Sequence, residues 1–446
     1  MDRKENFAAL GLALEGVERM REKDFGVRGR VSALLLLLRG AYYTGEGKWR
    51  APAEEDLRAL WRGGVHDHIG GGFFSASHDR EWLRPDFEKR LDDNAILAFL
   101  YTEAWEKGRM GFYREAAESA LDWILRELSG PSGLYRAGQY AAEGENPYLF
   151  TPTQLRRILG DEKGRAFAES WDITEEGNLG DGLSIPNLIL NQRWNLIPEG
   201  YDDLRERVRL AREERGGLLT DERTPPAANA LLLAALAKAA RVFSDRRYLA
   251  AAEELASRLA LPLERSPLAR AALSFALTEL YAADFEPGRI AAAAENAETL
   301  GDLTRGSGDG PSPALDRTLS LAALAFDALW RLTGDELWRS RGAEILRELT
   351  EHPGRHGPES LGALCALFNL LGTPRALLCV CPGETPPAAL AALGSRYAPD
   401  LTLLLKTPAR AVALGAASPW TAALPIGGEC LFYPREQGKT GAPHRL

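Results

Sequence analysis

The sequence predicts a closed ring of helical hairpins over residues 1–370, followed by a small α/β appendage over residues 373–446. Ala- and Leu-rich segments of the first part repeat apolar residues every three to four positions, as amphipathic helices do. Short polar turns that end in an aromatic residue join several of these segments, for example EKGRMGFY at 106–113 and TGDELW at 333–338. This alternation is typical of repeated helical hairpins.

Helical periodicity is strongest in eight windows, which are interrupted by four long insertions rich in Gly, Pro and acidic residues. Irregular hairpin spacing with such insertions favours a closed toroid over an open solenoid, because solenoid repeats keep a steadier period. An open solenoid is excluded if the first and last hairpins pack together. The windows are 26–43, 92–108, 112–128, 227–243, 246–260, 267–283, 314–333 and 335–351, and the insertions are 62–91, 130–151, 172–200 and 298–313.

The composition changes at about residue 373. The segments PRALLCVCPG, PPAALAALGSRYA and LTLLLK predict a strand, a helix and a strand, and the final stretch predicts one more strand and a loose polar tail. The four cysteines lie in the last fifth of the chain, form no CxxC and fit a reducing compartment. We expect Cys379 and Cys381 to point to opposite faces of a strand and to pack in the core.

The net charge is -9, from 54 Lys and Arg against 63 Asp and Glu. This balance argues against nucleic acids and anionic membranes as partners. The N-terminus is charged and then helix-periodic, unlike a signal peptide, and the apolar run at 33–38 is far shorter than the roughly 20 residues of a membrane span. We therefore expect a cytoplasmic protein with neutral or small partners. We expect no nucleotide cofactor, because no phosphate loop or dinucleotide fingerprint is present.

The stretch GGVHDHIGGGF at 63–73 is the strongest candidate for chemistry. His66 and His68 flank Asp67, and an imidazole beside a carboxylate can form a positioned acid–base pair. A structural alternative is a loop clamp in which these side chains satisfy buried backbone groups. A metal site is a third interpretation, but no HExxH or CxxC pattern accompanies it, and we predict none. Gly70, Gly71 and Gly72 suit a tight turn or a close backbone approach.

Acidic residues follow this stretch. Glu88 and Asp92 would share a helix face if a helix began near Asp86, whereas Asp92 and Asp93 could instead be charges favoured by the dipole at a helix N-terminus. Trp82 could offer a stacking surface to a sugar ring or simply belong to the core.

The segments GGVHDHIGGGF and REWLRPDFEKRLDDNA resemble the signature of the spermatogenesis-associated and bacterial thioredoxin-domain proteins. Further motifs match in order along nearly the whole chain, including YLFTPTQLRRILGDEKG at 148–164 and RLTGDELW at 331–338. The resemblance implies an all-α (α/α)6 toroid of the six-hairpin glycosidase-like type, similar to the N-acylglucosamine 2-epimerases. That family carries an N-terminal thioredoxin-like domain, which we expect this chain to lack, so we expect no CxxC redox activity to be carried over.

The resemblance is incomplete at polar positions. Phe74 and Asp86 stand where the family has histidines, and Asp92 replaces a tyrosine, whereas Asn94 and Asn229 match. Either the cavity has acquired a different specificity, or it has lost its chemistry and kept a fold that binds. The surviving residues are chiefly Asp67, His68, Phe87, Glu88, Asp93 and Asn94.

These observations predict a carbohydrate-active or carbohydrate-binding barrel protein, either a divergent sugar epimerase or isomerase, or a glycosidase-like enzyme with an eroded site. The alternative is a noncatalytic scaffold for a protein partner such as a separate thioredoxin-like subunit, which an exposed apolar patch near the N-terminal helix would support. The predicted catalytic residues are His68 as general acid–base, Asp67 as its orienting partner, and Glu88 or Asp93 as the complementary carboxylate. The predicted substrate-binding residues are His66, His78, Trp82, Asp86, Asp92, Asn94 and Asn229.

Overall fold

The computed structural model describes Val17 and residues 26–194, 200–261, 266–301, 312–352, 356–436 and 438–445. The predicted N-terminal helix lies outside the described residues apart from Val17, and so do residues 195–199 and 302–311 of the predicted insertions.

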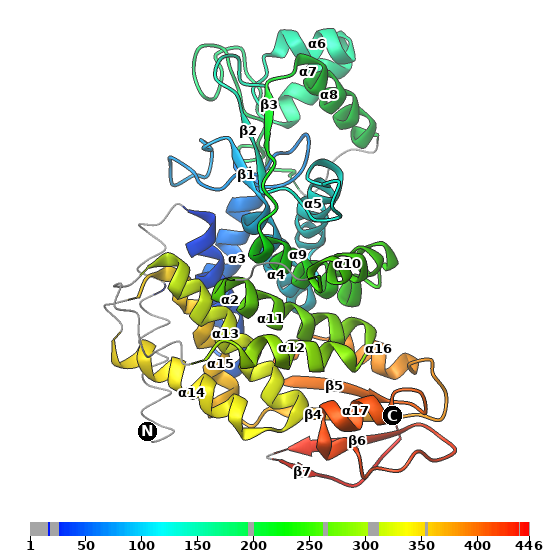
Figure 1. Ribbon diagram of the computed structural model, residues 1–446. Helices are drawn as coiled ribbons and strands as arrows, with labels where there is room; N and C mark the ends of the chain where they lie inside the picture. Colours follow the sequence, from blue (N-terminus) through cyan, green and yellow to red (C-terminus); the bar gives the residue numbers. More distant parts are fainter. Residues whose placement is uncertain are drawn as a thin grey trace.

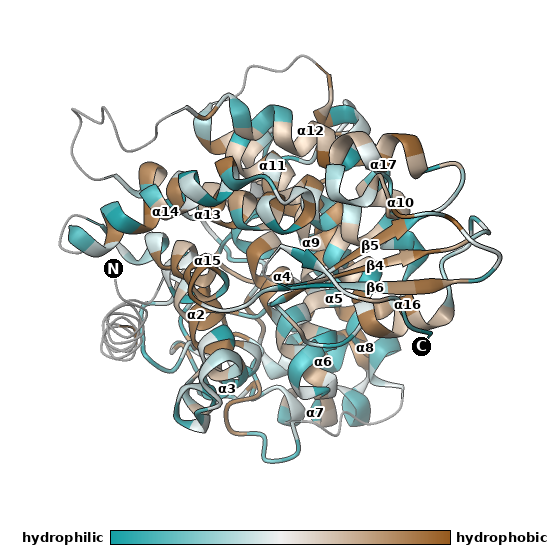
Figure 2. Cartoon of the chain, turned by 90° about the horizontal axis from the view of Figure 1, so that it is seen from below, coloured by the Kyte–Doolittle hydropathy of each residue, from teal (hydrophilic) through white to brown (hydrophobic). Residues whose placement is uncertain are grey.

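Six helices form a closed inner ring. Each packs against the next in chain order, and the last, α15, packs against the first, α2. The open solenoid is thereby excluded, and the predicted toroid is confirmed. Hydrophobic residues, brown in Figure 2, are concentrated where these helices meet. The inner helices are α2 (Val27–Thr44), α4 (Leu91–Gly108), α9 (Pro226–Phe243), α11 (Pro267–Asp284), α13 (Pro313–Thr333) and α15 (Leu361–Leu371).

Five inner helices carry an outer helix that follows directly in the chain and packs against them. Each pair is joined by a turn of two or three residues, and the residue after the inner helix takes a left-handed conformation, at Gly45, Arg109, Ser244, Phe285 and Gly334. All eight predicted windows match helices to within one or two residues. The outer helices are α3 (Gly47–Arg62), α5 (Gly111–Glu127), α10 (Arg246–Leu259), α12 (Gly288–Glu298) and α14 (Glu336–Glu351).

One helix of the ring, α9, is long and apolar enough to cross a membrane by composition alone. It is the inner helix of the α9–α10 hairpin, and 78% of its apolar window is buried inside the protein. Burial of this kind is what a core helix of a toroid requires, so its apolar character is explained by the ring.

Long connections run from outer helices back to inner ones, and they gather at one end of the barrel, at the top of Figure 1. They carry an antiparallel sheet, β1–β2–β3, and three helices that the sequence did not predict. We call this end, where the inner helices begin, the mouth. The elements are β1 (Glu88–Arg90), β2 (Gly138–Ala141), α6 (Pro152–Leu159), α7 (Asp161–Ser170), α8 (Tyr201–Arg215) and β3 (Leu218–Asp221), with a short 3-10 helix, η2 (Pro358–Ser360), before α15.

The α/β appendage covers the opposite end of the barrel, at the bottom of Figure 1. Its sheet has the order β5–β4–β6–β7, with β4 and β5 parallel and joined by α16, as predicted. The polar end, for which the sequence predicts a loose tail, instead pairs with β6 through two backbone hydrogen bonds between Phe432 and His444. The elements are β4 (Arg375–Val380), α16 (Ala388–Gly394), β5 (Leu401–Lys406), α17 (Ala411–Ala417), η3 (Pro419–Thr421), β6 (Leu431–Glu436) and β7 (Lys439–Thr440).

The cysteines of the appendage differ from the prediction. Cys381 forms a disulfide with Cys430, and the Cys379 sulfur lies 3.4 Å from that of Cys381. The expectation that Cys379 and Cys381 point to opposite faces is wrong, because residues two apart in an extended chain share a face. Cys365 and Cys379 are free and buried, as expected for core packing.

Candidate functional site

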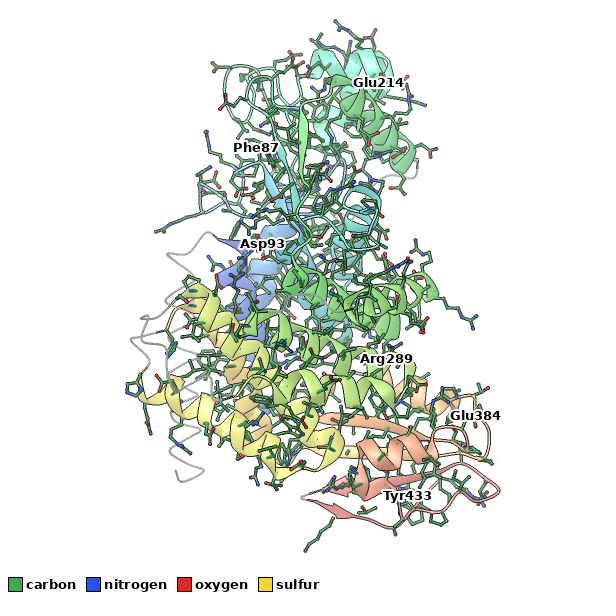
Figure 3. The ribbon with its side chains drawn as sticks, viewed as in Figure 1. Phe87, Asp93, Glu214, Arg289, Glu384 and Tyr433 are labelled. Atoms are coloured by element: carbon green, nitrogen blue, oxygen red, sulfur yellow. A yellow bond between two sulfur atoms is a disulfide. The ribbon has the colours of Figure 1, made fainter. Side chains whose placement is uncertain are left out.

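Charged side chains from three inner helices and from η2 meet at the mouth. Asp92 and Asp93 lie in the first turn of α4, Arg28 in the first turn of α2, and Arg317 near the start of α13. Glu359 comes from η2, just before α15. We call these five residues the mouth cluster. Figure 3 places Asp93 at the end of the barrel that carries the insertions, with Phe87 farther out.

Two arginines link the three carboxylates of the cluster. The Nη2 atom of Arg28 lies 2.7 Å from Asp92 Oδ2 and 2.7 Å from Asp93 Oδ1. Arg317 Nε lies 3.0 Å from Glu359 Oε2, and its Nη1 lies 3.6 Å from Asp92 Oδ2. Asp93 is nearly closed off, with 4% of its side chain exposed, whereas Arg317 is 26% exposed. A ligand at the mouth therefore reaches the arginines and Asp92 before it reaches Asp93.

The environment raises the pKa of two carboxyl groups in the cluster. Burial, followed by the negative charge of Asp92, raises the pKa of Asp93 to about 6, although Arg28 opposes this. Burial also raises the pKa of Glu359, against the attraction of Arg317. Asp93 thus has the pKa of a group that can hold or release a proton near neutral pH.

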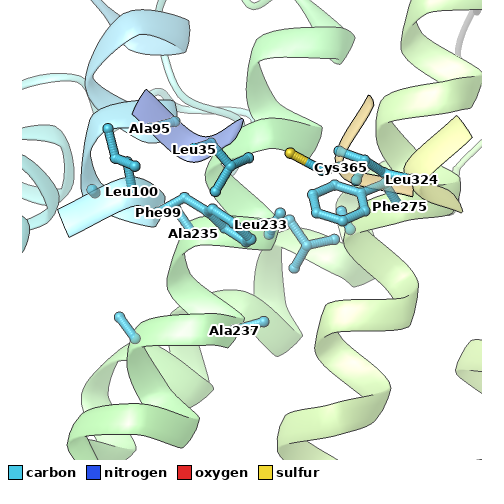
Figure 4. Close-up of a cluster of buried hydrophobic side chains, with 14 of the residues drawn as sticks. Leu35, Ala95, Phe99, Leu100, Leu233, Ala235, Ala237, Phe275, Leu324 and Cys365 are labelled. Atoms are coloured by element: carbon cyan, nitrogen blue, oxygen red, sulfur yellow. The ribbon is translucent and has the colours of Figure 1, made fainter. Parts of the chain in front are cut away.

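Below the cluster, the axis of the barrel is almost filled by apolar side chains. Figure 4 shows Leu35, Phe99, Phe275 and Leu324 from four inner helices turned toward one another. A cavity of about 100 Å³ is left between them, and its upper lining includes Arg28, Asp92, Arg317 and Glu359. Ligand pockets usually span roughly 300–1,000 Å³, so a sugar ring does not fit inside the barrel axis.

The two histidines of GGVHDHIGGGF are buried rather than turned to a cavity. His66 and His68 are 2% and 4% exposed, and their Nδ1 atoms lie 3.2 Å apart. The other nitrogen of His66 contacts the Ser119 hydroxyl, and that of His68 contacts the Gly63 carbonyl. Burial lowers the pKa of His68 to about 4, so its ring is neutral and weakly basic at pH 7. Both ring nitrogens of His68 therefore contact other groups of the same loop, as the clamp interpretation expects.

The carboxylate of Asp67 does not orient His68. It accepts hydrogen bonds from Lys89 Nζ at 2.8 Å and from Arg212 Nη1 at 2.9 Å to each oxygen. The backbone N–H groups of Ile69 and Gly70 donate to it as well. Burial alone would raise the pKa of Asp67, but Arg212 and Lys89 outweigh it and hold the pKa well below its usual range. The predicted His68–Asp67 pair is thus replaced by an ionic anchor to α8.

The glycine triplet is explained by the same anchor. A Cβ atom on Gly70 would lie 1.8 Å from the Arg212 guanidinium, and one on Gly72 would lie 2.8 Å from the Trp123 ring. Gly71 and Gly72 also have φ values of 81° and 79°. The triplet therefore meets both demands that the sequence suggested, a turn with positive φ and a close approach.

Asn94 and Asn229 play equivalent parts in two successive hairpins. The side-chain amide of Asn94 bonds both the N–H and the carbonyl of Phe73, and that of Asn229 bonds both groups of Tyr135. Each amide also donates to the carbonyl four residues earlier in its own helix. Both side chains are fully buried. The two amides hold the incoming loops against the inner ring. Their oxygen and nitrogen atoms are occupied by these bonds and are not left for a substrate.

Glu88 does not share a helix face with Asp92, because it lies in β1 and α4 begins only at Leu91. Its side chain is 48% exposed and lies 3.8 Å from Arg90.

His78 and Asp86 lie together in a different place. They line a surface pocket of about 400 Å³ that shares no lining residue with the axial cavity.

Trp82 offers no free stacking face. The side chain is 3% exposed, and the guanidinium of Arg30 lies 5.5 Å from its ring centre. Trp82 and Phe87 both have positive φ values, 60° and 57°, which hold the loop before α4 in a sharply folded course. The core interpretation of Trp82 is the one that its burial supports.

Several residues of these two networks were not singled out in the sequence. Arg28, Arg317 and Glu359 carry no motif, and Arg212 lies 145 residues from its partner Asp67. Lys89 stands inside the quoted motif REWLRPDFEKRLDDNA, and its charge is a signal that could have indicated an ion pair with Asp67. Within the described ranges, no group of three or more His, Cys, Asp and Glu side chains is arranged to hold a metal ion.

The chain is homologous to spermatogenesis-associated protein 20. The Homo sapiens protein is 32% identical over 145 residues, which cover 28% of this chain and 18% of that protein, and the Mus musculus protein is 31% identical over the same length. An uncharacterized protein of Caenorhabditis elegans is 23% identical over 251 residues, 46% of this chain and 33% of that protein. The matches therefore span less than half of the relatives' length, and less of this chain than its motifs suggested. No family model matches the chain.

Solved structures with a related arrangement include two kinds of carbohydrate enzyme. Cellobiose 2-epimerase from Bacillus thermoamylovorans has a TM-score of 0.47 and 11% identity, over 77% of this chain and 87% of that chain. The α-1,6-mannanase GH76A of Salegentibacter has a TM-score of 0.41 and 13% identity, over 66% and 67%. The assignment of the (α/α)6 toroid to this protein rests on its own closed ring of inner helices.

Proposed function

We propose that this protein is a carbohydrate-active enzyme in which Asp92 and Asp93 form the reactive carboxyl pair, in place of the predicted His68 and Asp67. The observation that supports this most is the meeting of both carboxyl groups on one nitrogen of Arg28, 2.7 Å from each. The two oxygens are therefore separated by no more than twice that distance. Retaining glycosidases hold their carboxyl groups about 5 Å apart, whereas inverting enzymes keep roughly 6.5–9.5 Å.

The two aspartates differ in a way that suits two roles. Because its pKa is about 6, a fraction of Asp93 is protonated near neutral pH, and this form can donate a proton to a leaving oxygen. Asp92 is more exposed, at 15% of its side chain, and faces the mouth as the nucleophilic carboxylate. Epimerisation with the predicted His68 as base is less well supported, because His68 is buried and its pKa of about 4 lies well below neutral pH.

The substrate ring in this proposal lies across the mouth and not within the axis. The axial cavity of about 100 Å³ is too small for it, while Arg28 and Arg317 present N–H donors to hydroxyl groups at the rim. The Glu359 carboxylate completes a polar rim of both signs. Such a rim binds polyols through charge-assisted hydrogen bonds.

The test begins with thermal stabilisation by mono- and disaccharides and amino sugars, followed by hydrolysis of the strongest ligand. We expect Asp93→Asn to lower kcat about 10²–10⁴-fold, the usual contribution of a general acid, with the fold intact. The wild-type rate should fall as pH rises through about 6, because Asp93 then loses its proton. Asp181→Asn, at an exposed position, is the matched control.

Equal hydrolysis by wild type and Asp93→Asn would contradict the assignment of this pair. Failure of every saccharide to bind would move the conclusion to the noncatalytic scaffold. The apolar patch that would support a scaffold was predicted beside the N-terminal helix, which lies outside the described residues.

A further inference from the structure

We infer that a cavity between the barrel and the appendage is a binding site for a small oxyanion, such as phosphate or a short dicarboxylate. The cavity measures about 140 Å³ and lies at the end opposite the mouth cluster. Its walls are the last turns of five inner helices, and its cover is the segment 393–403 of the appendage. This inference is independent of the function proposed for the mouth.

Charged residues are unusually frequent in this lining for an internal cavity. Five cations face four carboxylates, and the cations outnumber the carboxylates although the whole chain is acidic. The cations are Arg39, Lys238, Arg241, Arg331 and Arg396, and the carboxylates are Glu103, Glu106, Glu279 and Asp327.

The paired carboxylates lie behind the arginines. Arg39 is 13% exposed and its partner Glu103 is 1% exposed. The corresponding values are 19% and 4% for Arg241 with Glu106, and 16% and 5% for Arg331 with Asp327. In every pair the cation has the accessible atoms. The solvent side of the cavity therefore presents guanidinium groups, whose planar donors suit carboxylate and phosphate oxygens.

The carboxylate of Glu103 also stays ionised, so Arg39 is held in place. Burial alone would raise the pKa of Glu103, but Arg39 and Lys238 outweigh it and lower the pKa to about 2. Arg39 uses Nε and Nη2 on Glu103, and Arg331 uses Nε on Asp327 and Nη1 on Thr402 of β5. These bonds fix the orientation of each guanidinium and do not involve Nη1 of Arg39 or Nη2 of Arg331. A site fixed in advance loses little side-chain entropy when it binds.

Two residues modulate the site in opposite directions. Arg396 is exposed at the rim and, within the described residues, has no ion pair, so its charge is available to a ligand. Glu279 is partly exposed and repels an anion, although its charge attracts Lys238.

A competing explanation is that the arginines only complement the helix ends. The inner helices end here, and their carbonyl groups favour cations.

The test is titration calorimetry of the full chain with inorganic phosphate and, separately, malonate, at fixed ionic strength set with chloride. We expect Arg396→Gln to weaken the affinity for both about tenfold, as the loss of one charge-assisted bond implies. Glu279→Gln should tighten it several-fold. Arg80→Gln, at an exposed arginine elsewhere, and Arg317→Gln, in the mouth cluster, should leave it unchanged.

Two results would overturn the inference. The first is an absence of phosphate and malonate binding above the chloride background, which would leave the arginines as partners of helix ends alone. The second is equal affinity in wild type, Arg396→Gln and Glu279→Gln, or a loss confined to Arg317→Gln, which would place the anion elsewhere. Arg396→Gln removes no partner from a buried carboxylate, so loss of folding does not confuse the outcome.

Discussion

Replacing Asp67 by asparagine tests whether the loop at 63–73 is an ionic clamp. The substitution keeps the shape of the side chain but leaves Lys89 and Arg212, 0% and 5% exposed, without their shared negative charge. Removing one partner from a buried ion pair costs about 3–5 kcal/mol, and here two cations are affected, so we expect a loss in that range. Asp181→Asn, which changes an exposed carboxylate, should alter stability by less than about 0.5 kcal/mol.

The assay is urea unfolding followed by circular dichroism, repeated across pH. The pKa of Asp67 is held below its ordinary value in the folded protein, so its stabilising effect is fully present above the unfolded pKa of about 3.9. The effect is lost as pH falls further toward the folded pKa. The difference in unfolding free energy between wild type and Asp67→Asn should therefore be present in full at about pH 5 and shrink below about pH 4. A difference under about 1 kcal/mol at pH 7 would refute the clamp.

Two further predictions concern stability and the appendage. Asn94→Ala and Asn229→Ala each remove a buried amide that makes three hydrogen bonds, and they leave backbone groups of Phe73 or Tyr135 unpaired. Each should therefore cost about 2–4 kcal/mol in urea unfolding, and a cost in only one of them would contradict their equivalence. Alkylation of the denatured, unreduced protein should label Cys365 and Cys379 but not Cys381 or Cys430, and labelling of all four before reduction would contradict the disulfide.

The sequence predicted the barrel helices well because their periodicity is a local property. The eight windows coincide with α2, α4, α5, α9, α10, α11, α13 and α14 to within two residues. Helices α3, α12 and α15 were not among the strongest windows, and α15 matters most because it closes the ring against α2. Its apolar residues are buried nearly all round, so it lacks the polar face that makes a helix periodic.

The candidate site was harder to predict because its partners are distant in the chain. Asp67 and His68 are neighbours in sequence, and that adjacency favoured a catalytic pair, but Asp67 binds Arg212 from 145 residues away. Asp93 was singled out, while its partner Arg28, 65 positions earlier, carried no motif. Whether Glu88 and Asp92 share a helix face depends on where the helix begins. The helix begins at Leu91, so Glu88 lies in the strand before it.

The central claim is that the mouth cluster binds and converts a saccharide. The most direct measurement is titration calorimetry of the saccharide that stabilises the wild type most, compared among wild type, Asp92→Asn, Arg317→Gln and Asp181→Asn. We predict that Asp92→Asn and Arg317→Gln each weaken the affinity about tenfold or more, through lost charge-assisted hydrogen bonds, and that Asp181→Asn does not. Equal affinity in all four proteins would contradict the claim and place any sugar site away from the start of α4.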